Sequence, residues 1–557
     1  MGAGPTGLTL AILLKQAGLS PVVFEKRTQL DSLPAAHVVN VRTCEIFREM
    51  SIFDAVAQAA APPEKMQAVT WRESVSGKVY GALALHGDPE SQGRRSVASP
   101  ARAVNIGQDD VERIMADRLR ALGGEILMGH EVSGATIRDG KPVLTFADGE
   151  QEFDYVIACD GVRSTVRQAL GIQMEGPASL AEFIAIYFKA DLSRHLDKTP
   201  GPVHFLAGAD VRGSIIGFDL ASIWALMCVV PSSDEAYARK DELGPELLRR
   251  AIDDPQIDFE ILSVGTWNMS AQVAARFQEG PILLAGDAAH RFPPTGGLGL
   301  NTGVPDAHNI AWKLIAIARG WAGPALLDTY EAERRPIALH NCEHSVSNMK
   351  RMVLIDKELE AEVLTPIDLS LIDRAPSPRL SVGLDAGTPE AQAKQARVDA
   401  AIEDEREHFD SLRVELFYAY PGKAGEDLHP AQPKTGSRVP HAWLAAKGTA
   451  HSTLEAEGTA HSTLDLCRDA FALIVGPRAE GWAQGVAREA VLRGMPMRIW
   501  AFENLGGTAD AWRASMGLDA DGAVLVRPDG HIAWLSSSAP MPDATVMLDA
   551  IATKGVC

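Results

Sequence analysis

The chain opens on a glycine-rich turn that runs directly into an apolar helix. Residues 2–7 read Gly-Ala-Gly-Pro-Thr-Gly, a mostly apolar stretch follows, and Gly18 precedes a second apolar run that ends at Glu25. A glycine turn, a helix, a stop and a short strand in this order are typical of a dinucleotide-binding βαβ unit. The segment therefore predicts an α/β fold in which a helix N-terminus faces a pyrophosphate.

Each glycine of the turn has its own expected role. Gly2 permits the tight turn, Gly4 lets the backbone approach a pyrophosphate, and Gly7 lets the helix pack closely. Glu25 stands where such units accept hydrogen bonds from a ribose. A buried strand should precede the turn, but only Met1 does so here, and we therefore expect the first strand to be missing.

Composition narrows the classes of function. A chain of 557 residues exceeds what one hydrophobic core supports, which predicts about three domains. Lys and Arg number 53 against 73 Asp and Glu, and the net charge of −20 disfavours nucleic acids and anionic membranes as partners. The six cysteines form no C-x-x-C pair, and no run is apolar enough to span a membrane. We expect a cytoplasmic protein that acts on small molecules.

Two later segments each carry an aspartate from a buried strand into a turn. Residues 153–159 lead to an Asp-Gly pair at 160–161, and residues 281–286 lead to Asp287. A glycine-rich stretch at 296–303 then opens a helix that we expect from about Asp306, so free backbone N–H groups and the positive end of the helix dipole face whatever lies before it. Such a site stabilises an anion, as reduced flavin is.

In this order and at these intervals, the three segments resemble the signatures of the class A FAD-dependent aromatic hydroxylases over nearly the whole chain. Within that family the chain is similar to phenol hydroxylases, 2,4-dichlorophenol 6-monooxygenases and polyketide aromatic hydroxylases. The resemblance implies that NADPH or NADH reduces FAD, that O2 adds at flavin C4a, and that the hydroperoxide hydroxylates a phenolic or polycyclic aromatic substrate.

The resemblance also assigns cofactor-binding residues, with Asp287 holding the ribitol of FAD. The full set of assigned contacts is Gly2, Gly4, Gly7, Glu25, Arg42, Gln108, Asp160, Gly161, Asp287, Pro294, Gly299, Leu300 and Asn301. On the residues alone, Arg42 and Gln108 could equally be surface or helix-cap residues.

His37 is the candidate catalytic residue. A phenol has a pKa of about 10, so a histidine that titrates near about 6.5 is a suitable base to form the more nucleophilic phenolate. The alternative is a histidine that only lines the flavin. His290 and His308 have no second ligand at metal spacing, so we interpret them as structural and predict no metal site. The candidate substrate contacts are Tyr187, Asp219 and Trp224.

The predicted architecture is a Rossmann-like FAD-binding domain, a mixed-sheet substrate domain and a C-terminal thioredoxin-like domain. The predicted boundaries are 1–75, 96–180 and 270–350 for the FAD-binding domain, 76–95 and 181–269 for the substrate-binding sheet, 351–430 for a helical segment and linker, and 431–557 for the thioredoxin-like domain.

Without C-x-x-C, the C-terminal domain is expected to serve packing or dimer contact, and we expect a homodimer. A near repeat at 448–464 is interpreted as a duplicated surface loop. Two alternative functions stay open, namely a flavin-dependent oxidoreductase without oxygen insertion and a non-catalytic truncated homologue.

Overall fold

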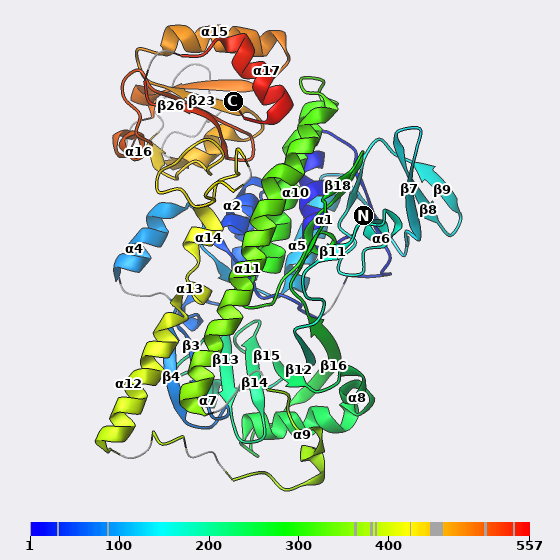
Figure 1. The fold of residues 1–557 in the computed structure, drawn as a ribbon, viewed down its shortest axis with the longest axis vertical. Coiled ribbons are helices and arrows are strands. Elements are labelled where there is room, and N and C mark those ends of the chain that lie inside the picture. The colour runs from blue at the N-terminus through cyan, green and yellow to red at the C-terminus, as the bar shows by residue number, and fades with distance from the viewer. Residues whose placement is uncertain are drawn as a thin grey trace.

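The structure, a computed structural model, describes residues 2–30, 33–85, 89–360, 365–378, 382–384, 387–423, 425–445, 460–505, 509–538 and 541–556. Three parts follow one another along the long axis: an α/β core in the middle, a broad sheet at one end and a C-terminal domain at the other (Figure 1). Most of the predicted duplicated loop at 448–464 lies outside the described residues.

The α/β core contains two short parallel strand pairs. Strand β1 (Val22–Glu25) pairs with β6 (Glu125–Met128), and β10 (Val156–Ala158) pairs with β19 (Ile282–Leu284). An antiparallel strand, β18 (Gln278–Glu279), extends the second pair. In the described residues the parallel sheet is therefore in two parts.

Gly2 lies between these two parts of the sheet. Its N–H donates to the Phe24 carbonyl at 2.7 Å, and a Cβ on Gly2 would lie 2.2 Å from the Cys159 carbonyl oxygen. The φ of Gly2 is 88°, a conformation that favours glycine. Backbone therefore crowds this position on both sides, and no side chain fits.

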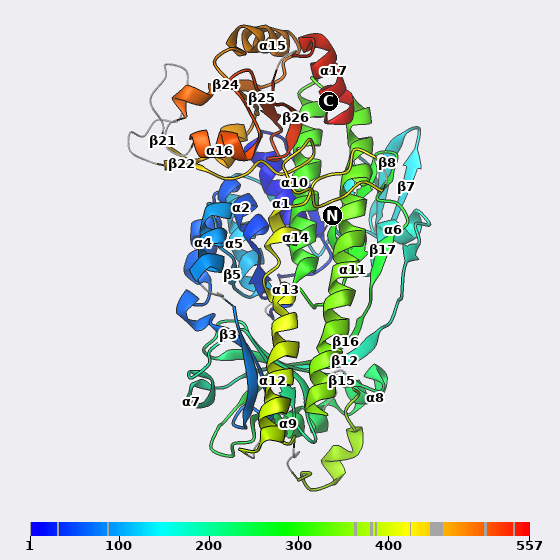
Figure 2. The ribbon, with the colours of Figure 1, turned by 60° about the vertical axis from the view of Figure 1, so that its left-hand side comes forward.

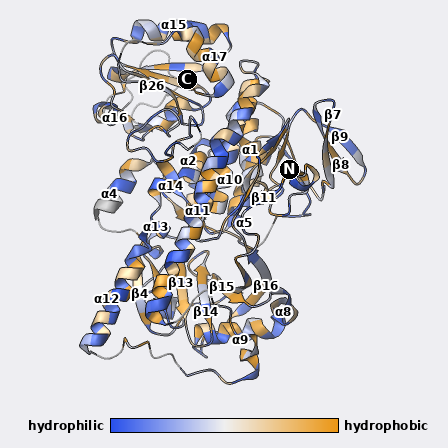
Figure 3. Ribbon diagram, in the orientation of Figure 1, coloured by the Kyte–Doolittle hydropathy of each residue, from blue (hydrophilic) through white to orange (hydrophobic). Residues whose placement is uncertain are grey.

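Helices enclose the core. Helix α1 (Pro5–Gln16) packs against α10 (Leu298–Ala318) and α5 (Gln108–Ala121). Both α1 and α10 are buried over most of their length, which matches their hydrophobic colouring (Figure 3). The shorter helices α2 (Val41–Glu49), α3 (Phe53–Ala59) and α6 (Thr165–Ala169) and the hairpin strands β7 (Gly134–Arg138), β8 (Lys141–Phe146) and β9 (Gly149–Glu152) complete this part.

One long helix connects all three parts. Helix α11 (Asp328–Leu359) has 32 residues and runs beside α10 and past the seven-stranded sheet toward the far end (Figure 2). After it, α12 (Pro389–Asp404), α13 (Arg406–Phe409) and α14 (Leu412–Leu416) lead back toward the C-terminal domain. Among the described residues, no helix is both long and apolar enough to cross a membrane.

The broad sheet is seven-stranded and mostly antiparallel. Its strands are, in order, β16 (Glu260–Met269), β12 (Ala181–Lys189), β15 (Ile223–Val230), β14 (Arg212–Gly217), β13 (Val203–Ala207), β3 (Ala68–Arg72) and β4 (Val79–Ala84). Alternate residues of β12 face opposite sides, as the pleat requires. One side joins the apolar core under α8 (Ser233–Ala238) and α9 (Lys240–Ile252), and the other side faces a cavity.

The C-terminal domain has a four-stranded sheet in the order β24 (Met497–Ala501), β23 (Phe471–Val475), β25 (Ala523–Val526) and β26 (Ile532–Ser536). Only the β23–β24 pair is parallel. The helices are α15 (Glu480–Leu492), α16 (Ala509–Ser515) and α17 (Ala544–Lys554).

Candidate active site

A cavity of about 1460 Å³ lies where the N-termini of α1 and α10 meet the seven-stranded sheet. It exceeds the roughly 300–1,000 Å³ of ordinary small-ligand pockets, so it has room for two ligands side by side. The predicted residues that line it are Gly2, Gly4, Glu25, His37, Gln108, Asp160, Gly161, Tyr187, Asp287, Pro294, Gly299 and Leu300. The predicted residues Gly7, Arg42, Asp219, Trp224 and Asn301 do not line it.

The N-terminus of α1 opens onto one end of the cavity. Gly4 is the N-cap, with no capping side chain and no acid in the first turn, so the first backbone N–H groups have no side-chain partner. A Cβ on Gly4 would meet only Glu112, at 4.0 Å, so a side chain here would extend into the cavity. Gly7 faces the protein instead, because its Cβ would lie 2.0 Å from the Gly2 carbonyl oxygen. This end can receive a pyrophosphate.

Glu25 lies beside this helix end and is already hydrogen-bonded. It accepts from the Ala3 N–H at 2.8 Å and from Arg27 Nε at 3.1 Å. Burial opposes its ionisation, but the hydrogen bonds from Arg27 and Ala3 outweigh burial and hold the pKa of Glu25 below its usual value. The group is therefore a carboxylate, and its two oxygens already accept four hydrogen bonds, one from Ala3 and three from Arg27.

Asp160 and Gln108 line the same end of the cavity. One Asp160 oxygen accepts from the Val166 N–H at 3.2 Å, whereas the buried Oδ1 has no hydrogen-bond partner within the described ranges. Gly161, with a φ of 77°, has open space where a Cβ would be. Gln108 donates from Nε2 to Glu112 at 2.9 Å.

Helix α10 presents a second N-terminus to the cavity. Its N-cap, Gly297, is left-handed with a φ of 62°, has no capping side chain and is followed by no acid in the first turn. Leu298, Gly299 and Leu300 line the cavity, and a Cβ on Gly299 would meet nothing within 4 Å. The positive end of a 21-residue helix therefore faces the cavity and favours an anion there.

Asp287 reaches the cavity from the loop between β19 and α10. Its carboxylate makes no hydrogen bond to any residue that the structure describes. The side chain is exposed toward the cavity; desolvation by the surrounding protein raises the pKa of Asp287, while the neighbouring charges of His290 and Arg291 lower it in part. A carboxylate without a partner that faces a cavity is suited to hydroxyl groups of a ligand.

Asp306 fixes this loop from behind. It accepts from the Gly286 N–H at 3.2 Å and contacts His290 Nε2 at 2.7 Å, while Arg334 Nε donates to its other oxygen at 2.7 Å. His290 is thus engaged with a carboxylate, and His308 contacts Glu49 at 2.8 Å. The predicted helix start near Asp306 is wrong by eight residues, because α10 begins at Leu298.

His37 lines the cavity with a defined tautomer. Its Nδ1 lies 2.8 Å from Asn105 Oδ1, and the Asn105 amide nitrogen donates to the Gly217 and Phe218 carbonyls at 3.0 and 2.8 Å. Because these carbonyls fix the amide nitrogen, the Asn105 oxygen must accept, and His37 Nδ1 must carry the proton. Burial lowers the pKa of His37, and the hydrogen bond to Asn105 offsets part of that effect. The free Nε2 is left as a proton acceptor.

Tyr187 lies near His37 on the same wall. Both rings contact Phe218. The His37 ring meets it edge-on with the centroids 5.9 Å apart, and the Tyr187 ring stacks on it with the centroids 6.0 Å apart. Burial raises the pKa of Tyr187, so its hydroxyl stays protonated.

The other two predicted substrate contacts lie elsewhere. Asp219 accepts from the N–H groups of the turn that follows it, including Ile223 at 2.8 Å, and so stabilises the turn before β15. The Trp224 ring is on the α9 side of the sheet and donates from Nε1 to the Ala190 carbonyl at 3.1 Å. The sequence predictions placed both in the cavity because the sheet register was unknown.

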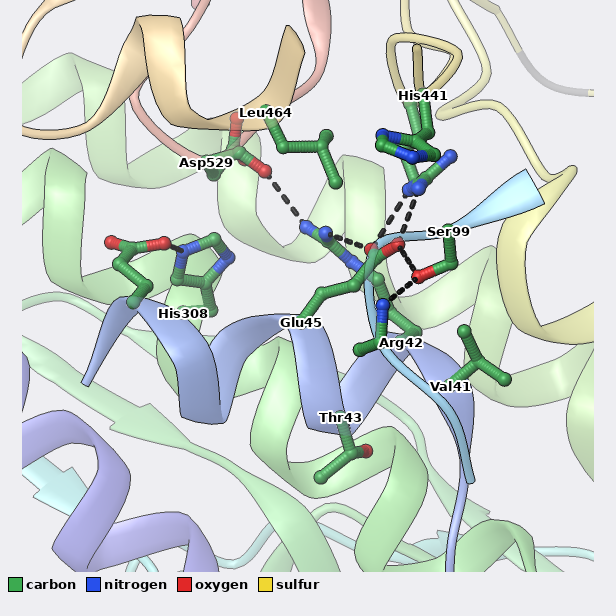
Figure 4. A network of polar contacts seen from close by, with 12 residues as sticks. Val41, Arg42, Thr43, Glu45, Ser99, His308, His441, Leu464 and Asp529 are labelled. Carbon is green, nitrogen blue, oxygen red and sulfur yellow. Dashed lines mark hydrogen bonds and ion pairs between the residues drawn. The ribbon is translucent and has the colours of Figure 1, made fainter. Parts of the chain in front are cut away.

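Arg42 was predicted beside the cofactor, and the structure places it in a buried polar network instead (Figure 4). Its guanidinium donates to Glu45 at 2.9 Å and to the Asp529 carbonyl of the C-terminal domain at 2.8 Å. Arg438, also of the C-terminal domain, donates to Glu45 at 2.9 Å, and Ser99 donates to the same carboxylate at 2.6 Å. The helix geometry of α2 turns Arg42 away from the cavity.

Asn301 does not face the cavity; it links the first turn of α10 to α2 and the residues just before α2. Its Oδ1 accepts from the Asn40 N–H at 3.0 Å and from the Thr43 hydroxyl at 2.8 Å, and its Nδ2 donates to the Val38 and Gly297 carbonyls at 2.9 and 2.6 Å. Every polar group of its amide is used, so Asn301 positions the start of α10.

Three residues that shape the cavity carried no sequence signal that we could recognise: Asn105, Asp306 and Glu415. Glu415 lines the cavity and accepts from the Val41 N–H at 3.0 Å. Burial raises its pKa, although the charge of Arg95 and the bond from Val41 act against that.

FAD fits these residues. Two uncapped helix N-termini, the open cradle at Gly4 and Gly299, and the partnerless oxygens of Asp160 and Asp287 together suit a long ligand with a pyrophosphate, hydroxyl groups and an anionic ring. Among the described residues no group of three His, Cys, Asp or Glu side chains is arranged to hold a metal ion.

Two protein-family models match most of this chain. The FAD binding domain family matches residues 1–345, and the aromatic-ring hydroxylase C-terminal family matches residues 432–554.

Individual relatives cover nearly the full length. Phenol 2-monooxygenase of Pseudomonas sp. (strain EST1001) is 29% identical, over 100% of this chain and 92% of its own. Tetracenomycin B2 monooxygenase-dioxygenase of Streptomyces olivaceus is 29% identical, over 98% and 96%. The crystal structure of the flavin-dependent monooxygenase PieE in complex with FAD and substrate superposes with a TM-score of 0.82 at 27% identity, over 100% of this chain and 96% of that one.

Proposed function

This chain belongs to the FAD-binding family of flavoprotein aromatic monooxygenases, and we propose that its cavity holds FAD along the two helix N-termini and a phenolic substrate against the seven-stranded sheet. The enzyme uses O2 and a reduced nicotinamide, as monooxygenases of this family do. The choice between NADPH and NADH is part of the test below.

FAD, when bound and reduced by the nicotinamide, would activate O2, from which one oxygen atom enters the ring and the other leaves as water. The chain would hold it with the first-turn amides of α1 at the pyrophosphate, with Asp287 at the ribitol hydroxyls, and with the first turn of α10 beside the flavin ring. Glu25, Gln108 and Asp160 would bind the remaining polar groups of the cofactor. Pro294, Gly299 and Leu300 would shape the wall next to the ring.

His37 would act as the base toward the substrate. It is neutral because burial lowers its pKa, and Asn105 keeps the proton on Nδ1, so Nε2 is free to take the phenolic proton. The phenolate that results has a more nucleophilic ring. Tyr187, whose ring contacts the same Phe218 ring as His37 does, would also hold the phenolic oxygen.

The observation that carries this proposal is the His37–Asn105 pair at the edge of a cavity that two uncapped helix N-termini face. The test uses the purified full chain: its visible spectrum, NADPH and NADH oxidation with and without a panel of phenols, and product formed under isotopically labelled O2. We expect bound FAD, faster oxidation with a phenol, and label in the product. Protein without FAD, or product without label, contradicts the proposal.

We also propose that the C-terminal domain is thioredoxin-like. It is supported by a four-stranded sheet with one parallel pair and helices α15 and α17. The only cysteine described in that domain, Cys467, is buried, and burial raises its pKa to about 12, so a dithiol activity has no support. For the other domains we propose the boundaries predicted from the sequence: 1–75, 96–180 and 270–350 for the FAD-binding domain, 76–95 and 181–269 for the substrate-binding sheet, and 351–430 for the helical segment and linker. One of these boundaries is moved, because β3 pairs within the seven-stranded sheet and the first sheet segment therefore begins before residue 76.

We propose that the FAD-binding domain is Rossmann-like, which is supported by the parallel pairs β1–β6 and β10–β19 and by the glycine turn at Gly2 between them. We further propose a cytoplasmic homodimer. Exposed apolar residues on α15 and α17, namely Val491, Leu492 and Val546, support a contact between copies. Light scattering of the purified protein tests the dimer, and substituting Leu492 with Glu should then yield monomers.

A further inference from the structure

The cavity face of the seven-stranded sheet is uneven. A row of residues crosses it in register, each paired with the next: Gly265, Ala185, Met227, Ser214 and Phe205. Ala185 and Ser214 have small side chains, and Gly265 has none. A Cβ on Gly265 would meet nothing within 4 Å. We call this row the trough.

Aromatic side chains bound the trough on both sides. On one side Phe183 and Trp267, paired across β12 and β16, stack with centroids 4.4 Å apart. On the other side stands Tyr187, beside Phe218 and His37. Phe183 and Tyr187 are four residues apart on β12, which is about 13 Å at a rise of ~3.3 Å per residue. One six-membered ring cannot contact both walls at once.

Methionine side chains of the cavity lining, inside and outside the trough, suit a large apolar ligand. Met227, Met349 and Met352 line the cavity, and methionine adapts to flat apolar surfaces. The Trp267 Nε1–H is buried and has no hydrogen-bond partner among the residues described. A carbonyl or hydroxyl oxygen at the far end of a ligand would supply that missing acceptor.

We infer that the substrate is a fused polycyclic phenol. Its reactive ring lies between His37 and Tyr187, and its other rings cross Ala185 and Gly265 toward Trp267. Gly265 is the residue that sets this specificity, because any side chain there would fill the trough while leaving the His37 end open. This inference rests on the proposed function and deepens it.

The test compares phenol, naphthol and hydroxyanthraquinone with the FAD-loaded wild type and two variants. Gly265→Leu fills the trough, and Trp267→Leu removes the far wall. Glu260→Leu, an exposed position on the same strand, is the matched control. Dissociation constants come from the fluorescence of each ligand, KM and kcat from NADPH oxidation, and thermal melting shows that each variant folds.

We expect the wild type to bind hydroxyanthraquinone at least about tenfold more tightly than phenol. Gly265→Leu should weaken hydroxyanthraquinone binding by at least about tenfold and leave phenol within about threefold, and Trp267→Leu should weaken only the larger ligands. Glu260→Leu should change neither. If phenol binds as tightly as hydroxyanthraquinone, or Gly265→Leu affects both alike, the inference is overturned while the monooxygenase function stands. If no phenol of any size speeds NADPH oxidation, the proposed function fails, and the inference fails with it.

Discussion

Two buried polar regions of this molecule differ in how completely their groups are paired. At the contact between α2 and the C-terminal domain, Glu45 receives hydrogen bonds from Arg42, Arg438 and Ser99. At the same contact with the C-terminal domain, Arg527 bridges Glu333 and Asp529, and Lys313 donates a hydrogen bond to Glu333 at 2.9 Å. The pairing lowers the pKa of Glu333 to about 2 despite its burial, since Arg527 and Lys313 stabilise the charge.

The cavity shows the opposite. Asp287 has no hydrogen bond within the described ranges, Asp160 Oδ1 and Trp267 Nε1 are buried without a partner, and His37 Nε2 faces open space. An unpaired polar group that lines a cavity can be satisfied by a ligand, whereas Arg42 Nε, which is unpaired in the first region, does not line the cavity. The paired region thus holds domains together, and the unpaired region is prepared for ligands.

The largest effect on activity is expected from His37→Gln. Loss of a general base costs about 10²–10⁴-fold in kcat/KM with phenol. The defect should shrink for phenols that are already ionised at the assay pH, because these need no base. Steady-state kinetics across a series of phenols of falling pKa measures this, with Glu260→Leu as control. An equal loss for every phenol would show that His37 only lines the flavin.

The largest effect on stability is expected from Arg438→Met. It leaves part of the buried Glu45 charge unpaired, which should cost about 3–5 kcal/mol of unfolding free energy. Arg468→Met, which removes a partly exposed pair with Asp465 in the same domain, should cost at most about 1 kcal/mol. Urea unfolding of both variants gives the comparison. Equal costs would contradict the distinction between the two regions.

Asp287→Ala should separate ligand binding from folding. The change removes a carboxylate that has no partner in the protein, so the apoprotein should be no less stable than the wild type. FAD affinity should fall by about 10- to 100-fold, because a hydrogen bond to a charged group contributes about 1.5–3 kcal/mol. Flavin fluorescence titration and thermal melting measure the two quantities. A destabilised apoprotein with unchanged FAD affinity would refute the assignment.

The smallest effect concerns pH. Since burial lowers the pKa of His37 below its ordinary 6.5, the base is already deprotonated near neutrality. The acid limb of kcat/KM should therefore lie below pH 6.5, and the rate with phenol should change less than about twofold between pH 7 and 8. In His37→Gln this limb should disappear. A limb at or above 6.5 would show that His37 is not the titrating base.

The sequence predicted those cavity-lining residues whose position depends on local chain geometry. Glycines of the α1 and α10 turns, and the aspartates 160 and 287 at strand ends, each owe their place to the few residues around them, and all but Gly7 line the cavity. His37 could be proposed because its chemistry suits a phenol, but the Asn105 that sets its tautomer is 68 residues away.

Residues whose role depends on distant partners could not be predicted. Arg42 looked like a cofactor contact, yet its partner Asp529 is 487 residues away. Trp224 was misplaced because a shift of one residue in a strand exchanges its two faces, and Asp219 because it belongs to the turn between β14 and β15. The trough also escaped prediction, because it exists only once five strands are aligned in register.

Helix α11 has a consequence for how the enzyme unfolds. At about 1.5 Å per residue its 32 residues extend about 48 Å. Within this length Glu333 contacts the C-terminal domain, Arg334 contacts Asp306, and Met349 and Met352 line the cavity at the substrate sheet. One helix contributes Tyr330 and Ala338 to the core of the α/β part and Met352 and Ile355 to the core at the substrate sheet, and its Glu333 is paired with Arg527 of the C-terminal domain. Loss of structure in one part should therefore disturb the others. Calorimetry should therefore show one cooperative transition where a chain of this length would ordinarily melt domain by domain.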